Sequence, residues 1–175
     1  TAVGQQLDEA AMQRLAAAGS TAWAELILWG VSAGSMLVAT GFVITATALL
    51  RGGRAAVIGA VAAGSVVMVA QLLKAVLERP MLLAESAGNS FPSGHVAAVL
   101  GLGVALVVAA PRASRWLVAV LVVGPAAGLT GLATVVLQWH RPSDVVGSVL
   151  LAVAVGALAT QLADRQPAPR SGSRW

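Results

Sequence analysis

Residues 55–77 read AAVIGAVAAGSVVMVAQLLKAVL, a run whose single charged residue, Lys74, lies near its end. About 20 consecutive apolar residues are enough for a helix to span a bilayer. Four further apolar stretches lie at about 23–50, 95–110, 116–139 and 143–163. These stretches are continuous and do not alternate, which disfavours a membrane β-barrel. The sequence therefore predicts an all-α polytopic membrane bundle with about five spans, of which 95–110 is short and needs neighbouring helices to shield its ends.

The composition supports a membrane protein. The chain is 58% hydrophobic and 10% charged, whereas a soluble domain carries about 25% charged residues. It has no cysteine, so neither disulfide nor thiolate chemistry is available. The net charge is +4, and the basic residues lie mostly in short loops and the C-terminal tail, which suits membrane orientation better than nucleic-acid binding. The expected partners are membrane lipids and not nucleic acid, with a homo-oligomer left open.

Three regions follow from this pattern. Residues 1–22 mix polar and apolar side chains and predict an amphipathic helix at the membrane interface, with a solvated leader as the alternative. Residues 23–163 form the membrane domain. Residues 164–175 are polar and rich in proline and arginine, which predicts a disordered basic tail.

The basic residues also predict an orientation. With five spans, seven arginines fall on one side, which the positive-inside rule makes cytoplasmic: Arg51, Arg54, Arg112, Arg115, Arg165, Arg170 and Arg174. The opposite side then holds residues 1–22, the 78–94 loop and the 139–143 turn. We expect this side to face the periplasm or the cell exterior.

The first polar motif is FPSGH at residues 91–95, directly before an apolar helix. Ser93 is a natural N-cap, and Gly94 lets a ligand approach the backbone. The unpaired amides at a helix start form an anion site suited to phosphate. His95 at this rim could protonate a leaving oxygen. The alternative is an ordinary capped helix start.

The second motif is HRPSD at residues 140–144. His140 and Asp144 are four residues apart, so they can meet near a helix start. Asp144 could accept a hydrogen bond from one ring nitrogen and leave the other free to attack, with imidazole as the nucleophile. The alternative is that Asp144 only caps its own helix.

The third motif is KAVLERP at residues 74–80. Lys74 and Arg79 could neutralise a phosphate, or Lys74 could simply pair with Glu78 along the helix. Two histidines and few carboxylates cannot build a usual metal site. We therefore expect no metal and no cofactor.

Together the three motifs resemble the type-2 phosphatidic acid phosphatase superfamily, over roughly residues 23–163. The resemblance implies a six-helix membrane domain, metal-independent hydrolysis and a phosphohistidine intermediate. It makes His140 the nucleophile, Asp144 its orienting partner and His95 the general acid. Ser93 and Gly94 would hold phosphate oxygens, and Lys74 would bind phosphate.

The chain departs from the family pattern in its arginines. Four residues separate Lys74 from Arg79 where the family has six, and the family's Ser-Arg pair in the third motif falls on Ala133 and Thr134. Arg79 and Arg141 are the expected substitutes for the missing charge. Five spans where the family has six suggest that a further span precedes Thr1, or that this is a five-span variant.

The predicted function is hydrolysis of a lipid phosphate by an enzyme of the inner (plasma) membrane. The alternative is a catalytically weak member that binds lipid phosphate or supports a partner protein. A transporter is disfavoured because the spans lack internal symmetry, and the spans exclude the soluble haloperoxidase relatives. Substrate candidates are phosphatidic acid, phosphatidylglycerol phosphate, polyprenyl pyrophosphate and polyprenyl-linked sugar phosphates. The Ala-, Val-, Gly- and Arg-rich composition favours a bacterial cell-envelope lipid.

Overall fold

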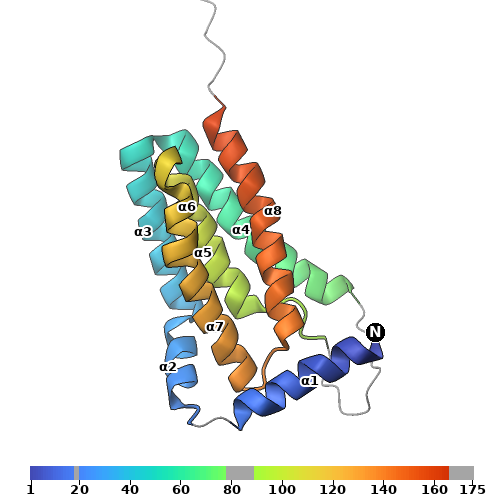
Figure 1. Cartoon of the computed structure of the whole chain (residues 1–175). Coiled ribbons are helices and arrows are strands. Elements are labelled where there is room, and N and C mark those ends of the chain that lie inside the picture. The colour runs from blue at the N-terminus through green and yellow to red at the C-terminus, as the bar shows by residue number, and fades with distance from the viewer. Residues whose placement is uncertain (18–19, 78–88, 166–175) are drawn as a thin grey trace, which may run out of the picture.

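The computed structural model describes residues 1–17, 20–77 and 89–165, and within these ranges the regular structure is helical without strands (Figure 1). The elements are α1 (Ala2–Ala16), α2 (Ala22–Gly30), α3 (Ala33–Arg51), α4 (Gly53–Val76), α5 (Gly94–Ala109), the 3₁₀ turn η1 (Arg112–Ser114), α6 (Arg115–Val118), the π-helical turn η2 (Ala119–Val123), α7 (Gly124–Val136) and α8 (Pro142–Asp164).

The predicted polytopic helical bundle is confirmed. Four helical segments of the described chain are long and apolar enough to cross a membrane: α3, α4, the continuous stretch Arg112–Val136, and α8. The shorter apolar helix α5 lies between them and contacts α3, α4, α7 and α8. Gly101 lets α5 approach α4 closely, because a Cβ at this position would lie 2.8 Å from the Ala63 carbonyl oxygen.

The predicted single span over 23–50 is wrong. The helix breaks at Val31 and Ser32, which separates α2 from α3. Ser32 is extended and caps α3 by accepting the Ser35 amide at 3.3 Å. The Ser35 hydroxyl in turn donates to the carbonyl of Gly30, the last residue of α2, at 2.5 Å. Small polar side chains thus satisfy the backbone groups that a helix break exposes, and only α3 remains long enough to span.

The π-helical turn η2 lies directly before Pro125 in the fourth apolar stretch. Proline has no amide hydrogen and its ring crowds the preceding turn of a helix. The chain widens just before it, and the Gly124 amide donates to the Ala119 carbonyl, five residues back. Such bulges are a common cause of bends in helices.

The bundle has two distinct ends (Figure 1). One holds the α3–α4 turn, the start of α6 and the end of α8. The other holds α1, α2, the α7–α8 turn and the start of α5. At 1.5 Å per residue, the 16 residues of α5 extend about 24 Å, whereas the 24 residues of α4 extend about 36 Å. The first residue of α5, Gly94, lies beside the Gln71 side chain, so α4 continues to Val76 for about one and a half turns beyond it. The predicted tail lies outside the described residues from residue 166 onward.

Candidate active site

The turn between α7 and α8 positions His140. The Thr134 carbonyl accepts the amides of Trp139 at 2.9 Å and His140 at 3.2 Å. Gln138, between the helices, has a φ of 61°, which is uncommon for a residue with a side chain. The turn leaves His140 only 8% exposed at the edge of the bundle.

Asp144 lies in the first turn of α8 and is fully buried. Its Oδ2 is 3.4 Å from His140 Nδ1. The same oxygen accepts the Arg141 amide at 3.0 Å and the Ser90 hydroxyl at 2.5 Å. The carboxylate is therefore held in place from two sides and faces one ring nitrogen of His140, which leaves Nε2 as the nitrogen available to a substrate.

The loop before α5 is fastened to α8. The Ser93 amide donates to the Asp144 carbonyl at 3.2 Å. The Ser148 hydroxyl bonds both the Ser93 carbonyl, at 3.0 Å, and the Asp144 carbonyl, at 3.1 Å. The Phe91 ring packs against Gly147 so closely that a Cβ at 147 would overlap it. Two motifs that are about 50 residues apart in sequence thus form one rigid unit.

The same loop is fastened to α4. Asn89 Nδ2 donates to the carbonyls of Lys74 at 3.0 Å and Leu77 at 2.6 Å, which are exposed at the helix end. Asn89 Oδ1 accepts the Phe91 amide at 3.0 Å. This capping brings the end of α4, with Lys74, beside the start of α5.

A cavity of about 640 Å³ opens where these elements meet. At the end near α8 its lining includes Gln71, Lys74, His95 and His140, with Gly94 beside them, and Ser32 and Thr40 of the α3 segment also line it. The two histidines therefore share one cavity with a lysine. The ring of His95 also lies near Trp139, with centroids 5.6 Å apart and planes tilted by 43°.

The cavity continues as an apolar groove along α3, α4 and α5. Its walls include Met36, Leu37, Val67, Met68 and Leu102. Leu37 and Met68 are exposed on the outside of the bundle, so the groove opens sideways toward the lipid. Gly64 lines it, and a Cβ there would meet nothing within 4 Å.

The remaining residues predicted from the motifs either do not line the cavity or lie outside the described residues. Ser93 is completely buried, its hydroxyl has no hydrogen-bond partner, and it does not line the cavity. Arg141 is also buried and absent from the lining, with its guanidinium 3.9 Å from Glu9 of α1. Arg79 lies outside the described residues.

Helix α1 lies across the end of the bundle that holds the site (Figure 1). The Asp8 carboxylate accepts the Ser143 amide at 3.1 Å and its hydroxyl at 2.6 Å. Gln138 Nε2 donates to the Met12 carbonyl at 2.7 Å. These contacts support the 138–143 turn from outside.

Sequence reasoning missed three residues of this arrangement. Gln71 precedes Lys74 by one helical turn, so its position on the cavity face was available from helical spacing. Ser90 directly precedes the first histidine motif, but its bond to Asp144 depends on tertiary structure. Nothing in the sequence indicated the contact of Asp8 with Ser143, because the two residues are 135 positions apart.

Thr134 occupies the place of the family's third-motif arginine. It is completely buried, and its hydroxyl donates to the Gly131 carbonyl at 2.8 Å. No charge can come from this position. Among the described residues, no group of three His, Cys, Asp or Glu side chains is placed to hold a metal ion.

Fold and site together define a multi-pass helical membrane protein in which two histidines line one cavity. The chain belongs to the PAP2 superfamily, whose family model matches residues 55–167. The motif resemblance is therefore confirmed. The fold is similar to a transmembrane PAP2-type phosphatidylglycerolphosphate phosphatase from Bacillus subtilis, with a TM-score of 0.75 and 21% identity over 97% of this chain and 90% of that chain. Among curated proteins, none matches the chain.

Proposed function

We propose that this protein is a membrane phosphatase that hydrolyses a lipid phosphate through a phosphohistidine intermediate on His140. The observation that carries the proposal is the cavity itself. It brings two imidazoles and an ammonium group together at one end and continues as an apolar groove open to lipid. A phosphate headgroup with a hydrocarbon chain fits both parts.

In the first step, Nε2 of His140 attacks phosphorus while the bond to the lipid oxygen breaks. His95 gives its proton to that oxygen, and the lipid alcohol leaves. In the second step, water attacks the phosphohistidine, His95 takes a proton from it, and inorganic phosphate departs with His140 restored. Asp144 keeps the His140 ring oriented and stabilises the positive charge that develops on it.

Phosphoryl transfer spreads negative charge over three equatorial oxygens. Lys74 supplies a full positive charge, and the amides at the start of α5 supply the positive end of a helix. Gln71 adds a neutral donor on the same lining. We further propose that the reaction needs no metal, that Arg79 approaches the phosphate, and that the site faces the periplasm or exterior.

The direct experiment is a phosphate-release assay on purified protein in detergent–lipid micelles, with a panel of glycerolipid and polyprenyl phosphates. We expect release from at least one of them, resistance to chelators and inhibition by vanadate, together with an acid-labile phosphoenzyme. His140→Asn should abolish both turnover and labelling. Activity that is lost in chelator and restored by a divalent ion would refute this mechanism.

The groove can be tested separately. Because a Cβ at Gly64 meets nothing within 4 Å and Gly64 lines the groove, we expect Gly64→Leu to fold and to fill the groove. We expect its KM for a long-chain lipid phosphate to rise about tenfold, with little change for a short soluble phosphate ester. Gly41→Leu is the matched control, since Gly41 is also unobstructed and does not line the cavity. Equal effects on long and short substrates would remove the groove from the proposal.

A catalytically weak, lipid-binding member is the second candidate. It is favoured by the buried Thr134 and by the position of Arg141 against Glu9, which together leave Lys74 as the cation on the described lining. One missing charge-assisted hydrogen bond costs about 1.5–3 kcal/mol. Lipid binding without phosphate release from any member of the panel would support this candidate.

A further inference from the structure

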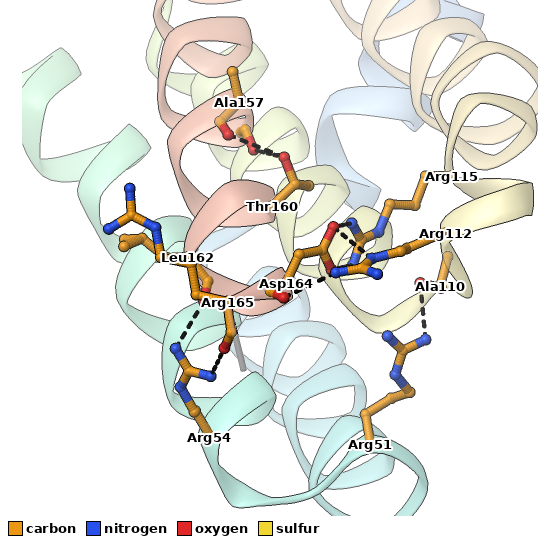
Figure 2. A network of polar contacts seen from close by, with 11 residues as sticks. Arg51, Arg54, Ala110, Arg112, Arg115, Ala157, Thr160, Leu162, Asp164 and Arg165 are labelled. Atoms are coloured by element: carbon orange, nitrogen blue, oxygen red, sulfur yellow. Dashed lines mark hydrogen bonds and ion pairs between the residues drawn. The ribbon is translucent and has the colours of Figure 1, made fainter. Parts of the chain in front are cut away.

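Five arginines converge at the end of the bundle opposite the candidate active site (Figure 2). They come from three separate segments: Arg51 and Arg54 from the α3–α4 turn, Arg112 and Arg115 from the start of α6, and Arg165 from the end of α8. Among the described residues, the cluster contains a single carboxylate, Asp164. Arg115 binds it through two nitrogens, at 2.7 and 3.0 Å, and Arg112 Nε lies 2.9 Å from it.

The other arginine contacts are to backbone carbonyls. Arg51 donates to Ala110 at 3.1 Å, and Arg54 donates to Leu162 at 2.9 Å and to Arg165. Carbonyls at helix ends carry only partial negative charge. Within the described ranges, neither Arg51 nor Arg54 forms an ion pair. The cluster therefore keeps an excess of positive charge.

That excess surrounds an open cavity of about 440 Å³. Four arginines and one aspartate line it: Arg51, Arg54, Arg112, Arg165 and Asp164. Planar guanidinium groups bind phosphate oxygens in pairs of hydrogen bonds. Basic pockets between membrane helices on the cytoplasmic side are suited to anionic lipid headgroups.

An apolar groove of about 690 Å³ meets the cluster at Asp164, which lines both. Helices α7 and α8 diverge from their shared turn (Figure 1), and residues of α5, α7 and α8 line the groove. The π-helical turn forms part of one wall. Gly128 also lines the groove, and a Cβ there would meet nothing within 4 Å.

We propose that cluster and groove form one binding site for an anionic phospholipid of the leaflet at this end. The phosphate lies among the arginines, and one acyl chain lies between α7 and α8. The headgroup bridges the α3–α4 turn, the start of α6 and the end of α8. Because such a lipid binds only the folded bundle, it stabilises the protein by linkage. This site is separate from the two histidines and does not depend on the chemistry proposed for them.

The test is thermal unfolding of the purified full chain in detergent, with native mass spectrometry to count bound lipids. The additions are phosphatidylglycerol, phosphatidylcholine with the same acyl chains, and glycerol phosphate or inorganic phosphate alone. We expect phosphatidylglycerol to raise Tm by roughly 5 °C, with one lipid retained. The zwitterionic lipid and the free phosphates should produce no comparable rise.

Variants assign the effect to this site. Arg112→Gln and Gly128→Leu should each lose most of the Tm rise, whereas Arg112→Lys should keep part of it. Gly64→Leu, which fills the groove of the histidine site, should keep all of it.

Three results would overturn the proposal. A rise in Tm with phosphate alone would mean a free-anion site, and equal rises with both lipids would mean nonspecific solvation. A dimer that Gly128→Leu dissociates would mean a second copy occupies the groove.

Discussion

The Ser90 hydroxyl lies 2.5 Å from Asp144 Oδ2, the same oxygen that lies 3.4 Å from His140 Nδ1. A serine from the loop before α5 thus contacts the carboxylate that lies beside the histidine before α8. A hydrogen bond to a buried carboxylate is among the stronger ones in proteins. We therefore propose Ser90 as a positioning residue.

Ser90→Ala tests this role. The loss leaves Asp144 with one donor fewer and the imidazole less firmly oriented, so we expect kcat to fall about tenfold. KM should stay within about twofold, because Ser90 does not line the cavity. Steady-state kinetics with Tm as the control measures both. A merely structural serine would lower Tm and leave kcat of the folded fraction unchanged.

His95→Gln tests the general acid. Protonation of the leaving oxygen contributes about 10²–10⁴-fold to such reactions, and it matters less when the leaving group is a good one. We expect a large loss of turnover on an alkyl phosphate and a much smaller loss on an aryl phosphate. His140→Asn should lose its activity on the alkyl and the aryl phosphate equally. Parallel losses in His95→Gln on the two substrates would exclude His95 as the proton donor.

Arg141 and Glu9 form a paired test. If Arg141 turns from Glu9 to the phosphate when substrate binds, Arg141→Ala should lower turnover at least tenfold. Glu9→Gln should then leave turnover unchanged or raised, because it frees the guanidinium. If the 3.9 Å pair is only a structural contact, both variants should instead lower Tm by similar amounts and leave kcat at the wild-type value.

Gly147→Ala tests the packing that joins the motifs. A Cβ at 147 overlaps the Phe91 ring, and overpacking of this kind costs about 1–3 kcal/mol. We expect a lower Tm together with reduced turnover, because the loop that carries Ser90 must shift. Adding Phe91→Leu should recover part of both losses. Wild-type behaviour of Gly147→Ala would show that the loop adjusts without cost.

The chain lacks cysteine, so single cysteines can test its orientation. Ala113, at the start of the α6 segment, and Ser20, between α1 and α2, lie at opposite ends of the bundle. In sealed cells, a membrane-impermeant thiol reagent should label Ser20→Cys and spare Ala113→Cys until the membrane is opened. Labelling of both from outside would contradict the proposed topology.

Apolar runs predicted the bundle well because length and hydropathy alone decide which segments can span. The bounds of α4, α5 and α8 lie within about two residues of the expected ones. The break before α3 was missed, since Gly30, Val31 and Ser32 do not interrupt a hydrophobic run. Only the side-chain bonds of Ser32 and Ser35 reveal it.

The contacts of the candidate site were likewise predicted only in part. The contact of His140 with Asp144 was predicted because the two residues are four apart at a helix start, which is a local relationship, although His140 itself lies in the turn before α8. The bond from Ser90, the support from Asp8 and the burial of Arg141 arise from contacts between distant segments, which a single sequence does not show. The roles proposed for the site residues stay predictions: His140, His95, Asp144, Lys74, Arg79, Ser93, Gly94 and Arg141.

The short α5 has a consequence for how the protein responds to its membrane. His95 is the second residue of α5, so it lies about 21 Å along the helix from Ala109 at the other end, which is less than the roughly 30 Å hydrocarbon thickness. With the arginine cluster placed at one face of the hydrocarbon layer, as the proposed topology has it, we expect His95 to lie below the other face, so that a lipid headgroup is drawn below its normal plane to reach it. Hydrophobic mismatch adjusts local bilayer thickness around such segments. A thinner bilayer would bring headgroups and water nearer to His95, so we expect the acyl-chain length of the host membrane to change the proposed turnover although it alters no side chain of the site.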